Sequence, residues 1–377
     1  RMLTATTTPY SSVTDELDWT GSRDAWSQLE TGAIADYFNE FTDQAFPFVG
    51  EARFVGDDAI VRLRSFDAAG TLTNRALLGQ ALLYTAIVYA SIADMYDDFA
   101  FSEKTDAAAP IGRAQMGTLY DQAITYLDEA NTVANSSSGA AFVALRFPVM
   151  AYRARVKHAR AVWQSITPKL APGVNRNAAL INDAGANADA AAALALGAPN
   201  EEYSHRNSVG SEAGINIWFE VTGRSEHGLG SVYRNLVDPV TGALDVYVQG
   251  RIAAFTAFGT ESGDMWITNT REMHLILAEA AIAGGGSGQA QINAIRALDA
   301  GRTAWNGTSP APLAVLQYER QAQLFLMRRR LADMHRFDLK DTKWTANPNF
   351  ESTFNVNGLL FPIPNIERLG NPCIENP

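Results

Sequence analysis

The sequence predicts a mainly α-helical protein, and three features of its 377 residues support this prediction. Apolar residues recur at helical spacings of three and four over residues 75–95 and in several later segments. Short polar or glycine-rich turns, such as residues 284–288, separate these segments, so consecutive helices should pair as neighbours. Between residues 199 and 268 the pattern changes to frequent glycines and short β-prone runs, which indicate an irregular region with a few short strands.

The N-terminal part of the chain is expected to be the least regular. Residues 1–14 include the run Thr6-Thr7-Thr8-Pro9 and read as a flexible tether. Residues 15–41 carry aromatic and aliphatic residues at helical spacing, which predicts a helix. Phe46-Pro47-Phe48-Val49-Gly50 interrupts that pattern, and its proline and glycine favour a loop.

The central and C-terminal segments predict a scaffold of helix pairs. Small residues at the expected crossings would let neighbouring helices pack closely, as in tetratricopeptide-like arrays. We therefore expect a single domain over residues 1–377, with a helical-pair scaffold over 75–198 and 269–340. The helices predicted within it span 75–95, 117–130, 140–163, 177–196, 269–283, 289–298 and 313–337.

Residues 199–268 are expected to carry the ligand-binding region. Residues 215–221 and 244–248 are β-prone, and the Asp-Pro-Val-Thr-Gly run over 238–242 has the chemistry of a hairpin turn. Further on, Pro362 and Pro364 forbid a helix and predict an extended tail. Because loops commonly carry function on a rigid scaffold, the irregular region is the natural place for a site.

Composition excludes several classes of protein. The net charge of −11 is poorly suited to phosphate backbones, so no nucleic-acid partner is expected. The single cysteine, Cys373, rules out an internal disulfide and any multi-cysteine metal site. The five histidines show no metal-binding spacing, so neither a metal nor a cofactor is predicted. No uninterrupted apolar run of about 18 residues indicates a membrane-spanning helix.

No catalytic motif stands out, so the chain is predicted not to be an enzyme. It contains neither a Gly-x-Ser-x-Gly nucleophile turn nor a phosphate-binding loop. An all-helical glycoside hydrolase stays open as an alternative, since acidic residues are plentiful in the irregular region although no motif selects a pair. These residues are Glu201, Glu202, Glu212, Glu220 and Glu226.

Aromatic residues are the remaining candidates for a binding site. Sugar rings stack on flat aromatic faces, while polar groups orient their hydroxyls. The aromatic residues in the irregular region and in the expected loop at 46–50 are therefore candidate ligand-binding residues, with ordinary core packing as the alternative. They are Trp218, Trp266, Tyr203, Phe46 and Phe48.

Several segments, taken in order, resemble the SusD/RagB family of outer-membrane glycan-binding lipoproteins. The closest likeness is in the tail, where Leu360-Phe361-Pro362-Ile363-Pro364, Asn371-Pro372 and Glu375-Asn376-Pro377 are similar to the family's closing signature. The segments 277–280 with 292–296, 319–320 with 329–337, and 120–130 resemble its helix motifs. The segment 96–99 departs from the family pattern because it lacks the glycine and the Val-Pro of the usual loop.

This resemblance implies a SusD-like helical scaffold that captures an oligosaccharide, or in some branches a peptide, during nutrient uptake and polysaccharide utilisation. It also implies a partner, a SusC-like TonB-dependent outer-membrane barrel over which the protein acts as a lid. The expected location is the cell surface, with attachment only through a lipid on an N-terminal cysteine absent from this chain. A tetratricopeptide-type scaffold that binds peptides in a groove stays open as the other alternative.

Overall fold

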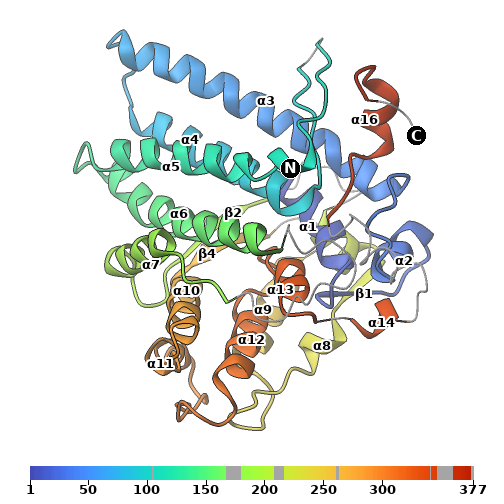
Figure 1. The fold of residues 1–377 in the computed structure, drawn as a ribbon, viewed down its shortest axis with the longest axis vertical. Helices are drawn as coiled ribbons and strands as arrows, with labels where there is room; N and C mark the ends of the chain where they lie inside the picture. The colour runs from blue at the N-terminus through green and yellow to red at the C-terminus, as the bar shows by residue number, and fades with distance from the viewer. Residues whose placement is uncertain are drawn as a thin grey trace.

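The computed structural model describes residues 1–103, 106–166, 180–207, 216–259, 263–339, 341–345 and 360–374. The fold is mainly helical, as predicted, and its few strands form two small two-stranded sheets (Figure 1). The apolar core falls into three clusters, of which the first joins the N-terminal helices and the second joins the C-terminal ones.

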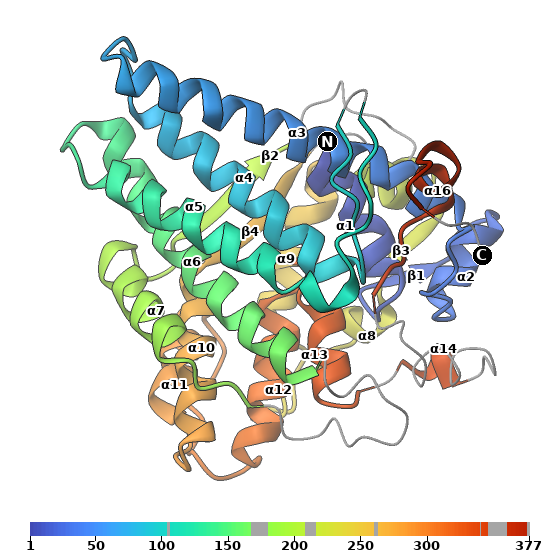
Figure 2. The ribbon, with the colours of Figure 1, turned by 45° about the horizontal axis from the view of Figure 1, so that its top comes forward.

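The predicted scaffold of helix pairs is present. It contains α3 (Glu40–Ala68), α4 (Ala76–Met95), α5 (Thr118–Ala134), α6 (Ala140–Ile166) and α7 (Ala184–Leu196). Each helix packs against the next along the chain, so the five form a layered array (Figures 1 and 2). Four of the helices predicted from apolar spacing coincide with α4 to α7, although the start of the fourth prediction lies outside the described residues.

Glycines at helix crossings explain how closely these helices approach. A Cβ added at Gly79 of α4 would lie 2.9 Å from Leu145 and 3.2 Å from Val133, side chains of α6 and α5. A Cβ at Gly56 of α3 would lie 2.5 Å from the Thr85 hydroxyl on α4. These spacings leave no room for a larger side chain, so the array depends on small residues at its crossings.

The C-terminal half continues the array from α7. Helix α10 (Thr270–Ala283) packs against α7, and α11 (Gln289–Arg296) and α12 (Pro312–Gln323) pack against α10. Helix α9 (Val246–Ala257) lies against α12 and contributes Phe255 to the second core cluster. The two helices predicted on either side of the glycine-rich turn at 284–288 are therefore confirmed.

The single helix predicted over 313–337 is wrong, because the chain breaks between α12 and α13 (Arg330–Arg336). Leu326 and Arg328 both have φ of 57°, a left-handed conformation that costs a non-glycine residue about 1–2 kcal/mol. The Leu326 N–H donates to the Glu16 carboxylate at 2.7 Å, a contact far away in sequence that apolar spacing cannot reveal.

The two sheets hold the irregular region in place. Strand β1 (Leu17–Trp19) pairs antiparallel with β3 (His227–Leu229). Strand β2 (Glu202–Arg206) pairs antiparallel with β4 (Asp264–Asn269), with a bulge at Tyr203 and Ser204. Further short elements are the helices α8 (Ser231–Arg234), α14 (Thr342–Thr345) and α16 (Asn365–Gly370), and a 3₁₀ turn over Arg113–Gln115.

Both strands predicted inside 199–268 are wrong. Part of the run at 215–221 forms a π-helical turn over Phe219–Gly223, while residue 215 lies outside the described residues. The run at 244–248 leads into α9 at Val246, after a single bridge between Leu244 and Val237. The predicted turn over 238–242 does close this bridge, with Gly242 at φ 71°.

The flexible tether predicted for residues 1–14 is wrong, because residues 2–12 form a buried helix, α1 (Met2–Ser12). Thr6, Thr7 and Thr8 are fully buried. The Thr6 hydroxyl donates to the Met2 carbonyl at 2.9 Å and the Thr7 hydroxyl to the Leu3 carbonyl at 2.7 Å. Because each hydroxyl finds a partner within its own helix, a polar-looking run can be buried.

Two further N-terminal predictions differ from the structure. Residues 15–41 do not form one helix but contain β1 and the short helix α2 (Asp24–Glu30). The loop predicted at 46–50 lies inside α3, which continues through Pro47.

The C-terminal tail is extended where two prolines predicted it, and it ties distant segments together. The Phe361 N–H donates to the Met95 carbonyl at 2.7 Å, at the end of α4. The Asn371 side-chain amide donates to the Ser102 hydroxyl at 3.0 Å and to the Ala108 carbonyl at 2.9 Å. The tail thereby holds the loop between α4 and α5, while residues 375–377 lie outside the described residues.

A buried carboxylate on α10, Glu279, gathers charges from several helices. Arg336 of α13 donates to it from two nitrogens, and His158 Nε2 of α6 lies 3.0 Å from it. Arg320 of α12 lies 3.5 Å away and also pairs with Asp333 at 2.9 Å. Burial alone would raise the pKa of Glu279, but the charge of Arg336 and the His158 contact outweigh it and hold the pKa well below its usual value.

Replacing this carboxylate should destabilise the protein strongly. Glu279→Gln leaves the fully buried Arg336 short of a counter-charge, so we expect a loss of about 3 kcal/mol in the free energy of unfolding. Urea unfolding measures the loss. The control is Arg62→Gln, which breaks an exposed ion pair with Asp58 and should cost less than about 0.5 kcal/mol. A Glu279→Gln variant as stable as this control would contradict the prediction.

Candidate functional site

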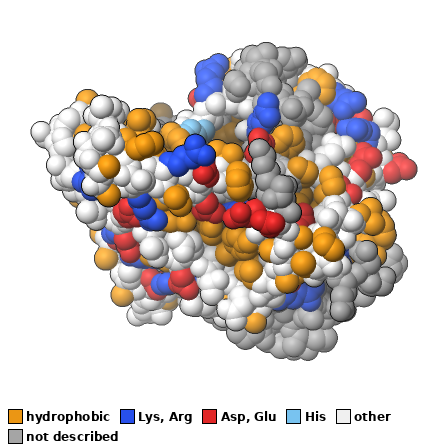
Figure 3. All heavy atoms as spheres, turned by 90° about the horizontal axis from the view of Figure 1, so that it is seen from above, with side chains coloured by type: hydrophobic (Ala, Val, Ile, Leu, Met, Phe, Trp, Pro, Cys, Tyr) orange, Lys and Arg blue, Asp and Glu red, His pale blue; other side chains and the backbone are white. Residues whose placement is uncertain are grey.

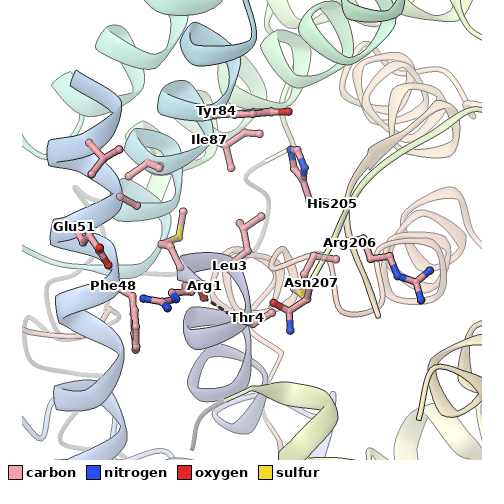
Figure 4. A pocket seen from close by; sticks show the side chains of 15 residues that line it. Arg1, Leu3, Thr4, Phe48, Glu51, Tyr84, Ile87, His205, Arg206 and Asn207 are labelled. Atoms are coloured by element: carbon pink, nitrogen blue, oxygen red, sulfur yellow. Dashed lines mark hydrogen bonds between the residues drawn. The ribbon is translucent and has the colours of Figure 1, made fainter. Parts of the chain in front are cut away.

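A pocket opens where α1, α3 and α4 meet the β2–β4 sheet (Figure 4). Its volume is about 590 Å³, within the range of small-molecule sites in proteins. The lining residues are Arg1, Met2, Leu3, Thr4, Phe48, Glu51, Ala52, Val55, Tyr84, Ile87, Val88, His205, Arg206, Asn207 and Met265.

Two aromatic side chains face the pocket from different helices. Phe48 projects from α3, and Tyr84 projects from α4 on the other side of the opening (Figure 4). Tyr84 is 44% exposed although most of α4 is buried and apolar, so its ring is available to a ligand. Flat aromatic faces at the edge of a concave site favour contact with the apolar face of a bound ring.

His205 of β2 continues this aromatic surface. Its ring meets the Tyr84 ring edge-on, with centroids 4.7 Å apart and planes at 77°. The Tyr203 hydroxyl lies 2.8 Å from His205 Nε2, so the strand holds the imidazole in one orientation. Burial lowers the pKa of His205, and the charge of Arg328 lowers it further. His205 is therefore a neutral hydrogen-bonding group at neutral pH.

Polar groups lie on opposite sides of the pocket. Glu51 of α3 and the Arg1 side chain occupy one side, and Asn207, just after β2, occupies the other (Figure 4). The Arg206 side chain points away from the centre in Figure 4 and lies over the Phe258 ring at 5.6 Å. The pocket can thus offer hydrogen bonds from two sides to a molecule held between them.

The floor between these sides is apolar. It is formed by Leu3 of α1, Ile87 and Val88 of α4, and Met265 of β4. The face seen in Figure 3 shows hydrophobic side chains lying beside basic and acidic ones around a hollow. An apolar floor with polar groups at its sides suits a ligand that has both an apolar face and hydroxyl groups.

Two of the five residues predicted from the sequence lie at this pocket. Phe48 lines it, and Tyr203 stands behind His205 through their hydrogen bond. Burial raises the pKa of the Tyr203 hydroxyl, and contact with Tyr84 raises it further, so the hydroxyl keeps its proton. The structure therefore brings these two together with Tyr84 and His205.

The other three predicted residues are buried in the core, so their rings are not open to a ligand in this structure. Trp218 is 1% exposed and stacks on Phe255 at 5.3 Å. Trp266 is 4% exposed, with the Arg251 guanidinium 3.6 Å from its ring centre. Phe46 is 4% exposed in the first core cluster, because residues 46–50 are helical rather than a loop. Residue type and region alone could not separate binding from packing.

Several pocket residues were not predicted. Tyr84 sits in a helix whose apolar run suggested only core, yet a tyrosine among aliphatic residues was a usable signal. His205 follows Tyr203 at the two-residue spacing that places both on one face of a strand. Leu3 and Thr4 lay in the segment predicted to be a tether, so nothing in their pattern indicated that they line a pocket.

Two other features of the described part of the chain bear on function. It holds no group of three or more His, Cys, Asp or Glu residues that could bind a metal ion. Helix α4 is long and apolar enough to cross a membrane by length and composition, but 78% of its apolar window is buried inside the protein. The apolar character of α4 is therefore explained by its place in the core.

No family model matches the sequence, and no curated protein sequence matches it. Solved structures do match over nearly the whole chain. A SusD superfamily protein from Bacteroides vulgatus ATCC 8482 aligns with a TM-score of 0.60 and 14% identity, covering 99% of this chain and 92% of its own. A SusD-like protein from Bacteroides fragilis NCTC 9343 aligns with a TM-score of 0.62 and 13% identity, covering 98% and 93%.

The chain has the SusD-like fold. The likeness read from the tail and helix motifs is confirmed at the level of the fold. A further structure, solved with a xylogluco-oligosaccharide, aligns with a TM-score of 0.61 and 14% identity, covering 100% of this chain and 98% of its own. At such identities the SusD-like fold is shared, while the residues that contact a ligand must be derived from this chain.

Truncating Trp218 should affect stability rather than binding. Trp218→Ala removes a fully buried ring stacked on Phe255, so we expect a loss of about 3–5 kcal/mol in the free energy of unfolding. Thermal and urea unfolding measure it, with Phe66→Ala as the control because Phe66 is 51% exposed at the end of α3. A Trp218→Ala variant of normal stability that fails to bind sugar would instead favour a direct binding role.

Proposed function

We propose that this protein is a non-enzymatic binding protein that captures an oligosaccharide in the pocket between α1, α3, α4 and β2. The observation that carries the proposal is the combination, in one pocket of a SusD-like fold, of two aromatic faces with polar groups on two sides. The structural neighbour solved with a xylogluco-oligosaccharide supports a sugar as the ligand class.

The geometry indicates how a sugar chain would be held. Tyr84 and Phe48 would contact the apolar faces of sugar rings, and Glu51, His205 and Asn207 would orient hydroxyl groups. Tyr203 would act behind His205, by fixing the ring that meets the ligand. Of the residues predicted from sequence, Phe48 and Tyr203 are therefore retained as proposed ligand residues.

The carboxylates of the pocket favour binding over hydrolysis. Glycoside hydrolysis uses two carboxyl groups facing one bond, about 5–9.5 Å apart. Among the described residues that line the pocket, Glu51 is the one carboxylate. The pocket therefore supports recognition of a sugar chain without a built-in pair for cleaving it.

We further propose, by analogy with the SusD-like fold alone, that the captured sugar passes to a TonB-dependent barrel in the outer membrane. In this proposal the protein is held at the cell surface by a lipid on a residue preceding Arg1. Such an anchor needs no membrane-spanning helix, since acyl chains insert into the bilayer themselves. This agrees with the burial of α4 inside the protein.

Removing the aromatic faces should weaken sugar binding without unfolding the protein. Tyr84→Ala and Phe48→Ala each lose a stacking contact worth about 1 kcal/mol, or about fivefold in Kd. Calorimetry with a xylogluco-oligosaccharide, followed by a wider oligosaccharide panel, measures the change. The matched control is Phe66→Ala, an exposed aromatic on the same helix as Phe48. Unchanged affinity in both variants would exclude this pocket as the sugar-binding site. Binding of peptides without binding of any sugar would favour the peptide-binding alternative.

The transport proposal predicts a stable complex with a barrel. Co-expression with a TonB-dependent barrel gene from the same locus, followed by detergent extraction and affinity purification, should recover both proteins together. Purification with the barrel omitted is the control. Recovery of this protein only in the soluble fraction, when expressed with its native leader, would contradict surface anchoring.

A further inference from the structure

Arg328 is a buried cation that forms no ion pair of its own in the described part of the chain. It belongs to a run of three arginines of which the other two are paired, Arg329 with Asp94 at 2.8 Å and Arg330 with Asp15 at 2.7 Å. Arg328 is 3% exposed, and it donates one hydrogen bond, to the Thr7 hydroxyl at 3.4 Å.

This arrangement is unfavourable for the isolated protein. Burial and, after it, the nearby charge of Arg155 together lower the pKa of Arg328 to about 10 against the opposing charge of Asp94, yet the group stays protonated at neutral pH. An uncompensated buried charge destabilises a protein strongly. The residue also has φ of 57°, and strained backbone combined with an unpaired charge is more often found at functional sites than in plain scaffolding.

Arg328 lies beneath the proposed sugar pocket. Its partner Thr7 is about one turn along α1 from Leu3 and Thr4, which line the pocket. Its charge also acts on the wall of the pocket formed by β2, because it contributes to lowering the pKa of His205. The lining adds the side chains of two arginines, Arg1 and Arg206, against the single carboxylate of Glu51.

Among the described residues, the pocket and its floor thus carry more positive than negative charge, in a protein whose net charge is −11. When charge of one sign surrounds a concave site with apolar walls, the electric field is concentrated in the site. The local concentration of ligands with the opposite charge is therefore raised. A neutral sugar would leave this excess charge uncompensated, whereas a sugar with an anionic substituent would offset it.

We infer that the pocket selects a sugar chain bearing an anionic group, a carboxylate or a sulfate ester. The inference rests on the proposed capture function and narrows its ligand class. The Arg1 side chain and the Asn207 amide can meet the anion directly, since they line the pocket, while the Arg206 guanidinium points away from its centre and adds charge at its edge. Arg328 acts from below as a fixed positive charge that the ligand compensates without contact.

Matched pairs of probes test the inference. Trigalacturonic acid is compared with its methyl ester, and a sulfated galactan oligosaccharide with its desulfated form, so each pair differs only in charge. We expect the acid or the sulfated form to bind about threefold or more tightly than its neutral partner, as one unit charge several ångströms away in a solvated site would give. The preference should shrink as NaCl is raised from 20 to 500 mM, because salt screens the attraction.

Two variants locate the effect. Glu51→Gln removes the exposed lining carboxylate, and it should raise the ratio of charged-probe to neutral-probe affinity about threefold, whatever its effect on the hydroxyl contacts that both probes share. Arg328→Gln should weaken the charged probe by a similar factor. If Arg328→Gln fails to fold, Glu51→Gln and the salt series still decide whether the pocket prefers an anionic sugar. The control variant is Arg62→Gln, on the exposed face of α3.

The outcomes separate this inference from the proposed function. Neutral probes that bind in a Tyr84-dependent way, with no preference for either charged form, would overturn the inference and leave sugar capture intact. A charge preference that Glu51→Gln does not alter would place the anion elsewhere and also overturn it. Absence of binding by every probe would overturn both. Preference in one pair alone identifies the carboxylate or the sulfate as the recognised group.

Discussion

The architecture depends on one buried carboxylate, Glu279. Besides the arginines and the histidine that surround it, it accepts a hydrogen bond from the Ile181 N–H at 2.8 Å, just before α7. A single group on α10 thereby sets the positions of α6, α7, α12 and α13 relative to each other. Apolar contacts alone tolerate sliding between helices, whereas directional charged hydrogen bonds in a low-dielectric core do not. The scaffold is consequently held in one register.

That rigid register is what allows a site to form at the edge of the array. The pocket walls come from segments far apart in sequence, namely α1, α3, α4 and the strand pair β2–β4. None of these could hold a ligand alone, and β2 is a short strand with one hydrogen-bonded neighbour. Because the helices do not shift, the Tyr84 and His205 rings keep a fixed geometry at the candidate site, as a preorganised binding surface requires.

The sequence predicted the helical scaffold well, because long apolar stripes report directly on burial. It located the candidate pocket and some of the backbone only in part, for an identifiable reason in each case. Trp218 and Trp266 were chosen by residue type, but aromatic residues fill cores as readily as sites. Thr6 to Thr8 looked solvated because composition does not register hydroxyls that bond within their own helix. Leu326 and Arg328 break a helix through contacts with α1 and the segment after it, which no local pattern contains.

The order in which the chain leaves the ribosome matters for this fold. The earliest segments find their partners among the last, since Asp15 pairs with Arg330 and the end of α4 at Met95 is capped by Phe361. Such contacts join residues some 300 positions apart in the sequence. At about 5–20 residues synthesised per second, the partners of the first helices emerge tens of seconds after those helices. The N-terminal helices therefore complete their packing only after translation has nearly ended. A protein built this way stays open and unfinished through most of its synthesis, because its first helices lack their C-terminal partners until the end.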